Sequence, residues 1–146
     1  MKKVFIKVVL SLFIIFLFGL SCYADDVKLQ NYKYSIDEEL SRCSSANFMT
    51  VGMNLCIQKG IDSWNKEIDK YLNLLKSVTT EEDYNNILKA QKDWETYKDS
   101  EFEAVSVIME KQGTMFLNFT VGMKSALIKE RALFLKEFYD TLSYKN

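Results

Sequence analysis

The sequence predicts an all-α protein, an antiparallel bundle of three long helices preceded by a short helix. Three observations support this prediction. The 146-residue chain has no Pro and only five Gly, so little interrupts a long helix. Apolar residues recur at spacings of three and four over three long stretches. Hydrophobic residues make up 48 % of the chain, which is enough for a single domain with its own core.

The first 24 residues have the layout of a secretory signal peptide. Positive charges at residues 2–7 precede an apolar run over residues 8–20, and Cys22-Tyr23-Ala24 offers a small-residue cleavage site. Two alternatives remain open, an uncleaved N-terminal anchor and a lipoprotein acylated on Cys22. We expect cleavage after Ala24 and a periplasmic or secreted location.

Cleavage would leave 122 residues, a flexible lead-in over residues 25–34 and a helical domain over residues 35–146. The removed piece holds three Lys and no acid, so sixteen basic and twenty acidic side chains remain, a net charge of −4. A mildly acidic chain without a basic cluster is a poor nucleic-acid binder. No later apolar run approaches the length of a membrane span, so we expect the mature chain not to cross a membrane.

The short first helix is expected to begin at Ser35, which would cap it together with Glu38 three residues later. Ile36 and Leu40 would face inward, and Cys43 follows one turn on. Residues 44–47 are expected to form a loop.

The second helix is expected over residues 51–76, with Thr50 as its N-cap. One face of this helix is apolar and consists of Met53, Ile57, Ile61, Trp64, Ile68, Tyr71, Leu72 and Leu75.

The third helix is expected to begin with a capping box, either Thr79 with Glu82 or Thr80 with Asp83. Its helical period continues to about Lys111, with Tyr84, Ile87, Leu88, Gln91, Trp94, Tyr97, Lys98, Phe102, Val105, Ile108 and Met109 on the repeating face.

The last helix is expected to start at Thr114, after a stop at Gln112-Gly113, and to end near Leu142. Its predicted inner face consists of Met115, Phe119, Met123, Leu127, Arg131, Phe134 and Phe138. Short loops favour antiparallel packing of the three long helices. We expect the stripe aromatics to lie in the core, namely Trp64, Tyr84, Trp94, Phe119, Phe134 and Phe138.

Export changes the interpretation of Cys43 and Cys56, the two cysteines left in the mature chain. An even pair in an oxidising compartment favours a structural disulfide, which would staple the first helix to the second. Two thiolates without His make a poor zinc site, and no C-x-x-C supports a redox role.

The absence of His excludes Ser-His-Asp and Cys-His nucleophile pairs and imidazole metal ligands. Carboxylates such as Glu101 and Glu103 are not marked out as a catalytic pair. We therefore expect no enzyme activity, no metal and no cofactor.

Two specific motifs lie in the helical domain, Thr50-x-x-Met53-Asn54-x-Cys56 and Ala90-Gln91-x-x-Trp94-x-x-Tyr97-Lys98-Asp99, and weaker ones are Ile68-Asp69, Gly113-Thr114-Met115 and Arg131. In their order and spacing between about Cys43 and Leu135, these motifs resemble the LprI-like lysozyme inhibitor family.

Departures from the family pattern are informative. Phe102 and Met123 stand where relatives often carry Cys, which suggests that an apolar contact replaces a bridge, and Lys98 replaces an Arg. We interpret the motif residues as mainly structural, with Trp94 as a core anchor and Gln91 as a bridge between helices. Asp99 and Arg131 have the right types for an interhelical ion pair.

The resemblance implies an exported protein that inhibits lysozyme, whose cleft works with two carboxylates. Polar or basic side chains on loops would suit such a cleft, and the candidates are Lys76 and Glu81 near one connection and Lys111 and Gln112 near the other. An envelope interaction module with a partner other than lysozyme is the alternative.

Overall fold

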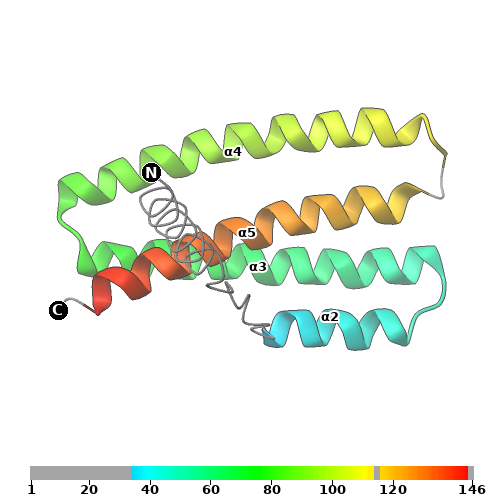
Figure 1. Cartoon of the computed structure of the whole chain (residues 1–146), viewed down its shortest axis with the longest axis horizontal. Coiled ribbons are helices and arrows are strands. Elements are labelled where there is room, and N and C mark those ends of the chain that lie inside the picture. Colours follow the sequence, from blue (N-terminus) through cyan, green and yellow to red (C-terminus); the bar gives the residue numbers. More distant parts are fainter. Residues whose placement is uncertain (1–33, 114–115, 145–146) are drawn as a thin grey trace, which may run out of the picture. The chain divides into compact units, whose positions relative to one another are not determined.

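The structure is a computed structural model that describes residues 34–113 and 116–144. Within these residues it contains helices and no strands (Figure 1). The predicted signal peptide, Cys22 and residues 25–33 of the predicted lead-in lie outside the described part, as do Thr114 and Met115. No helix in the described part is both long enough and apolar enough to span a bilayer.

The short helix α2 spans Ser35–Ser45 and packs against the long helix α3, Thr50–Val78. The cap predicted at Ser35 is wrong, because Tyr34 is the N-cap and no side chain caps this end. Tyr34 instead places its ring edge-on against Trp64, with ring centroids 5.4 Å apart. An aromatic contact therefore fixes the start of α2 where a hydrogen-bonded cap was predicted.

Helix α3 supplies most of the core, as its apolar stripe predicts. Ile61, Trp64, Ile68, Tyr71 and Leu75 are all buried. The helix begins one residue earlier than predicted, so Met49 takes the N-cap position and Thr50 is the first helical residue without a capping bond. Met49 offers no side-chain acceptor, which leaves this helix start without a side-chain cap.

Helix α4 spans Glu81–Glu110, within one residue of the prediction. Of the two N-caps considered, the structure has Thr80, because the backbone N–H of Asp83 donates to Thr80 Oγ1 at 3.2 Å. Only Ile87 and Gln91 are buried on this thirty-residue helix. The predicted stripe is therefore correct in period, but most of it is not enclosed.

Helix α5 spans Leu117–Ser143 after a turn in which Gly113 has a φ of +92°. The face predicted to be buried is wrong. Phe119 is 63 % exposed and Phe134 56 % exposed, and Met123 is exposed as well. The buried face consists of Thr120, Ser125, Ile128, Ala132 and Leu135. Small residues on this face let α5 approach α3 closely.

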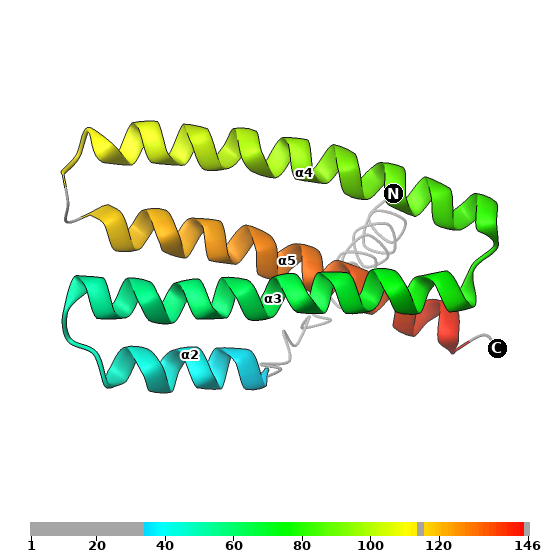
Figure 2. The same cartoon turned by 180° about the vertical axis from the view of Figure 1, so that it is seen from behind.

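The two helices that form most of the core run in the same direction. Tyr71 near the end of α3 meets Tyr139 near the end of α5, with ring centroids 6.1 Å apart. Figures 1 and 2 show α4 returning in the opposite direction. Consecutive long helices are therefore antiparallel as predicted, but the main packing pair is the non-consecutive, parallel pair of α3 and α5.

Two ends of the helical domain are used below as landmarks. The two-loop end holds the connection between α2 and α3 and the connection between α4 and α5, whereas the C-terminal end holds the α3–α4 connection and the end of α5 (Figures 1 and 2).

Candidate functional site

The Cys43–Cys56 disulfide predicted from the sequence is present and joins α2 to α3, with Cα atoms 5.6 Å apart. Asn47 lies beside it and donates through Nδ2 to the Cys43 carbonyl at 2.8 Å. A Cβ at Gly52 would lie 2.9 Å from Asn47 Cβ and Oδ1, so only glycine fits beside this side chain. Of the motif residues, Cys56 therefore has a structural role.

The motif residues that precede Cys56 have no comparable structural role in the described contacts. Thr50 is exposed and Met53 is half-buried. Asn54 places its Oδ1 in a buried position where no hydrogen-bond donor reaches it among the described residues. Buried amide oxygens are normally paired, so Asn54 Oδ1 is an exception among the described residues.

A polar cluster joins α4 to α5 at the motif residues Gln91 and Arg131. Arg131 Nε donates to Gln91 Oε1 at 2.9 Å, and Gln91 Nε2 donates to Glu95 Oε1 at 3.0 Å. The bridging role predicted for Gln91 is confirmed. Gln91 is buried and thus holds the two helices at a fixed register.

Trp94 lies beside this cluster, and two cations lie close to its ring. The Arg131 guanidinium carbon and Lys98 Nζ each lie 5.6 Å from the Trp94 ring centroid. Trp94 packs against the core but is only partly buried, whereas Trp64 is 2 % exposed. The prediction of a central core anchor thus fits Trp64 better than Trp94, whose ring faces positive charge.

Burial lowers the pKa of the Arg131 guanidinium below its ordinary value, and the nearby Glu95 carboxylate acts in the opposite direction. Loss of hydration makes such a cation a stronger partner for a negatively charged group. The ion pair predicted between Arg131 and Asp99 is wrong, because Asp99 is largely exposed and pairs with Lys98 at 3.3 Å. Tyr97, the remaining motif residue of α4, is exposed.

Phe102 and Met123 line one shallow groove between α4 and α5. They come from facing helices, so the positions that carry Cys in relatives lie in the same region here. A direct apolar contact between them stays a prediction.

The four loop residues proposed from the sequence fall into two separate places. Lys76 and Glu81 flank the α3–α4 connection, whereas Lys111 and Gln112 follow α4. All four are exposed. Helix α4 has thirty residues and is about 45 Å long, so the two pairs cannot touch one small cleft together.

Sequence reasoning missed an exposed apolar segment at the two-loop end. Phe48, Met49, Val51 and Leu55 form this segment, here called the apolar tip, and Phe48 is 91 % exposed. Leu117 and Phe119 at the start of α5 are exposed at the same end (Figure 1). The signal was present in the sequence, since Phe48, Met49, Val51 and Leu55 do not belong to the apolar stripe of α3. Exposed apolar clusters often mark binding surfaces.

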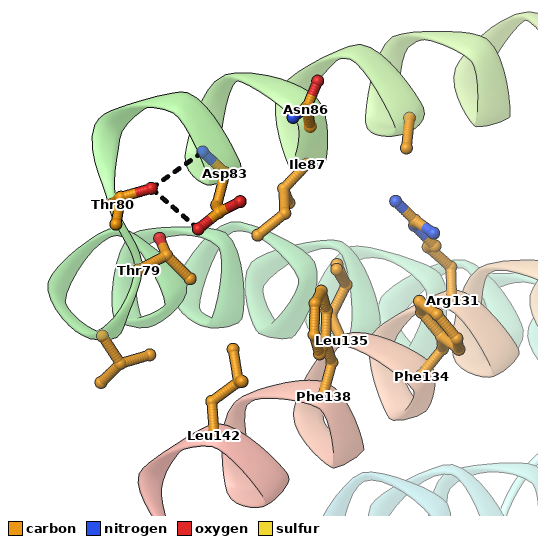
Figure 3. A pocket seen from close by; sticks show the side chains of 12 residues that line it. Thr79, Thr80, Asp83, Asn86, Ile87, Arg131, Phe134, Leu135, Phe138 and Leu142 are labelled. Atoms are coloured by element: carbon orange, nitrogen blue, oxygen red, sulfur yellow. Dashed lines mark hydrogen bonds between the residues drawn. The ribbon is translucent and has the colours of Figure 1, made fainter. Parts of the chain in front are cut away.

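A second missed feature is a groove of about 520 Å³ between α4 and the last part of α5 (Figure 3). The apolar lining residues are Val78, Ile87, Ala90, Phe134, Leu135, Phe138 and Leu142. Arg131 lies at one end, and Thr80 and Asp83 lie at the other. This is here called the Arg131 groove. Phe134 and Phe138, two of the phenylalanines that the sequence placed in the core, line this groove, and Phe138 also packs against the core.

The described residues offer surfaces for binding and no cluster for metal chemistry. No group of three or more Cys, Asp or Glu in the described ranges could hold a metal ion. The chemical groups that stand out are one desolvated cation, an apolar groove and an apolar tip.

A protein-family model described as Lysozyme inhibitor LprI matches residues 43–135. No curated protein and no solved structure matches the chain. The matched stretch starts at the disulfide and ends on α5, and it includes the cluster of Gln91, Trp94 and Arg131.

Proposed function

The chain belongs to the LprI lysozyme inhibitor family, and from this premise we propose that it is an exported helical protein that binds and blocks a peptidoglycan-cleaving muramidase. The single observation that supports this proposal is the family match over residues 43–135. Inhibition of this kind requires occupation of a cleft and no chemistry by the inhibitor, which suits a chain without His.

Charge on α4 favours association with a basic muramidase. This helix has nine acidic and three basic side chains, a net charge of −6, and all nine acids are exposed. The negative charge of the mature chain is thus concentrated on one helix. A concentrated field of this sign attracts a basic protein and speeds the encounter.

The two-loop end is the proposed contact surface. Lys111 and Gln112 are exposed on the turn there, and the apolar tip lies at the same end. Apolar anchors surrounded by polar groups are typical of protein interfaces. In this proposal Lys111 reaches the catalytic carboxylates, and Phe48 and Met49 supply the apolar contact. Lys76 at the opposite end is the weaker candidate, because its ammonium lies over the Tyr84 ring at 5.9 Å.

Export is part of the proposal and rests on residues 1–24, which have the layout of a signal peptide. The Cys43–Cys56 disulfide supports it, since such bonds persist in oxidising compartments. We propose cleavage after Ala24. A mass spectrum of the exported protein tests this, because acylation on Cys22 or an uncleaved chain would give a different mass and N-terminus.

The decisive experiment measures muramidase activity on peptidoglycan with rising amounts of the processed, disulfide-bonded protein. We expect inhibition, weakened about tenfold or more in Lys111→Ala and in Phe48→Ser. Lys76→Ala is the matched control and should inhibit like the wild type. Absence of protection at large molar excess would overturn the inhibitor function. Equal inhibition by all variants would overturn the proposed contact surface only.

The second candidate function is an envelope interaction module with a partner other than lysozyme. The observation that favours it is the apolar tip, whose chemistry suits any protein partner. Capture of a single stoichiometric partner that is not a muramidase, lost in Phe48→Ser, would select this candidate.

A further inference from the structure

The Arg131 groove has the composition of a small-molecule site. Its volume of about 520 Å³ lies within the range of ligand pockets, which are mostly apolar with a few placed polar groups. Ile87 from α4 faces Leu135 and Phe138 from α5 across it (Figure 3). Side chains do not fill this space, because α4 buries only Ile87 and Gln91.

The polar groups of the groove described below lie at its two ends. The Arg131 guanidinium lies at one end and points toward α4, next to Phe134 (Figure 3). At the other end, Asp83 is already bonded to Thr80, whose hydroxyl donates to Asp83 Oδ2 at 2.8 Å. A ligand with an anionic head would therefore place its head at Arg131 and its apolar body toward Leu142.

Arg131 keeps donors for such a head group. Its Nε bonds Gln91, and none of the hydrogen bonds or ion pairs among the described residues uses its two terminal nitrogens. A guanidinium with two parallel N–H groups matches a carboxylate in a bidentate manner. The Trp94 and Phe134 ring centroids lie 5.6 and 5.5 Å from the guanidinium carbon, and these contacts help to hold it in position.

We propose that the Arg131 groove binds a free medium-chain fatty acid, with its carboxylate on Arg131 and its acyl chain along Phe134, Phe138 and Leu142. Phe134, exposed without a ligand, would lose water contact on binding. This binding site is separate from the two-loop end and does not depend on muramidase inhibition.

The length of the groove sets the expected size of the acyl chain. Arg131 and Leu142 are eleven positions apart on α5, which corresponds to about 16 Å along the helix. A fully extended chain of single bonds advances about 1.2 Å per bond. Laurate, with a chain of about a dozen carbons, therefore fits from the guanidinium to Leu142.

The experiment is a calorimetric titration of the processed, disulfide-bonded protein with laurate below its micellar concentration. Dodecanol and dodecyltrimethylammonium provide the same tail without the carboxylate. We expect one laurate per chain, dodecanol bound about tenfold more weakly or worse, and no binding of the ammonium compound. Equal affinities for laurate and dodecanol would overturn the proposal.

Variants locate the site. Arg131→Gln should weaken laurate binding about tenfold or more, whereas Arg131→Lys should weaken it less because the charge remains. Lys89→Gln is the matched loss of one exposed cation from α4 and should change nothing. Unchanged laurate affinity in Arg131→Gln would overturn the assignment of the head group.

A second pair of variants keeps Arg131 in place. It distinguishes a blocked groove from misfolding as the cause of any loss of laurate binding. Ala90→Phe puts a ring into the groove, and Ala104→Phe makes the same change at an exposed position of α4 outside it. Only Ala90→Phe should abolish laurate binding. Laurate binding unaffected by Ala90→Phe would refute the site. A concentration-dependent dimer that Ala90→Phe dissolves, without laurate binding, would make the groove a self-association surface and also refute it.

Discussion

Which face of α5 is buried can be tested with two neighbouring residues. Leu135 is 1 % exposed and lies in the core with Leu75, whereas Phe134 is more than half exposed and lines the Arg131 groove. Leu135→Ala removes buried methyl groups and leaves a cavity, so we expect a loss of about 3 kcal/mol in the free energy of unfolding. Phe134→Ala removes the larger side chain from the more exposed position.

The expected cost of Phe134→Ala follows from its exposure. Full burial of a Phe side chain contributes about 1.5–3 kcal/mol, and less than half of that applies here. Loss of the contact with Arg131 adds about 0.5 kcal/mol, and the better helix propensity of Ala offsets a similar amount. We expect a net loss of about 1 kcal/mol.

The assay is urea denaturation followed by far-UV circular dichroism, with the two variants and the wild type measured side by side. An unchanged slope with denaturant in each variant would show that the midpoints report stability. A loss of unfolding free energy in Phe134→Ala equal to or above that in Leu135→Ala would refute the buried face of α5 described above. It would favour the face predicted from the sequence.

Other substitutions test the parts around the core. Replacing Cys43 and Cys56 together by Ala should lower the free energy of unfolding by about 3 kcal/mol. Reductant should lower the wild-type melting temperature by as much as the double substitution does, and a shift of only a degree or two would contradict the stabilising role of the disulfide. Gly52→Ala should cost about 1–2 kcal/mol because the new methyl meets Asn47, and Asn47→Ala should recover part of it in a double-mutant cycle; additive costs would count against that contact. Thr80→Ala should cost about 1 kcal/mol in the same denaturation assay, and a neutral result would mean that the α4 cap contributes nothing.

Local signals in the sequence placed most helix ends within one or two residues, but α5 begins at Leu117, three residues after the predicted start at Thr114. Thr80 caps α4 by accepting from the backbone N–H of Asp83, a contact that depends only on residues close in sequence, and Gly113 adopts a positive φ that few other residues tolerate. The N-caps of α2 and α3 were predicted one residue too late, at Ser35 and Thr50. The N-cap residues in the structure are Tyr34 and Met49, and neither makes a side-chain capping bond that the sequence could signal.

The buried face of α5 could not be predicted in the same way. Its phenylalanines are more hydrophobic than Ala132 and Ser125, so a pattern search favours the phenylalanine face. The choice of face depends on the neighbouring helix, and close packing against α3 selects small residues. The alternative face of α5 then lines the Arg131 groove, because α4 does not close over it.

The sequence pointed to two residues of the polar cluster between α4 and α5, Gln91 and Arg131, but it did not show that they bond to each other. Gln91 was identified as a bridge because a buried amide needs two partners. The partner of Arg131 depends on the rotation of α5, so the sequence suggested Asp99 where the structure has Gln91. The residues of the apolar tip do not belong to the apolar stripe of α3, but their position beside the start of α5 depends on how the helices are arranged.

The parallel alignment of α3 and α5 has a consequence for folding kinetics. The two helices that bury most of the core are separated in sequence by all of α4, and the Lys129–Asp37 pair closes a separation of 92 residues. Most small helical proteins fold through contacts between adjacent helices, which close short loops quickly. Here the chain must close a long loop before its core contacts form, so we expect this protein to fold more slowly than an up-and-down bundle of similar length.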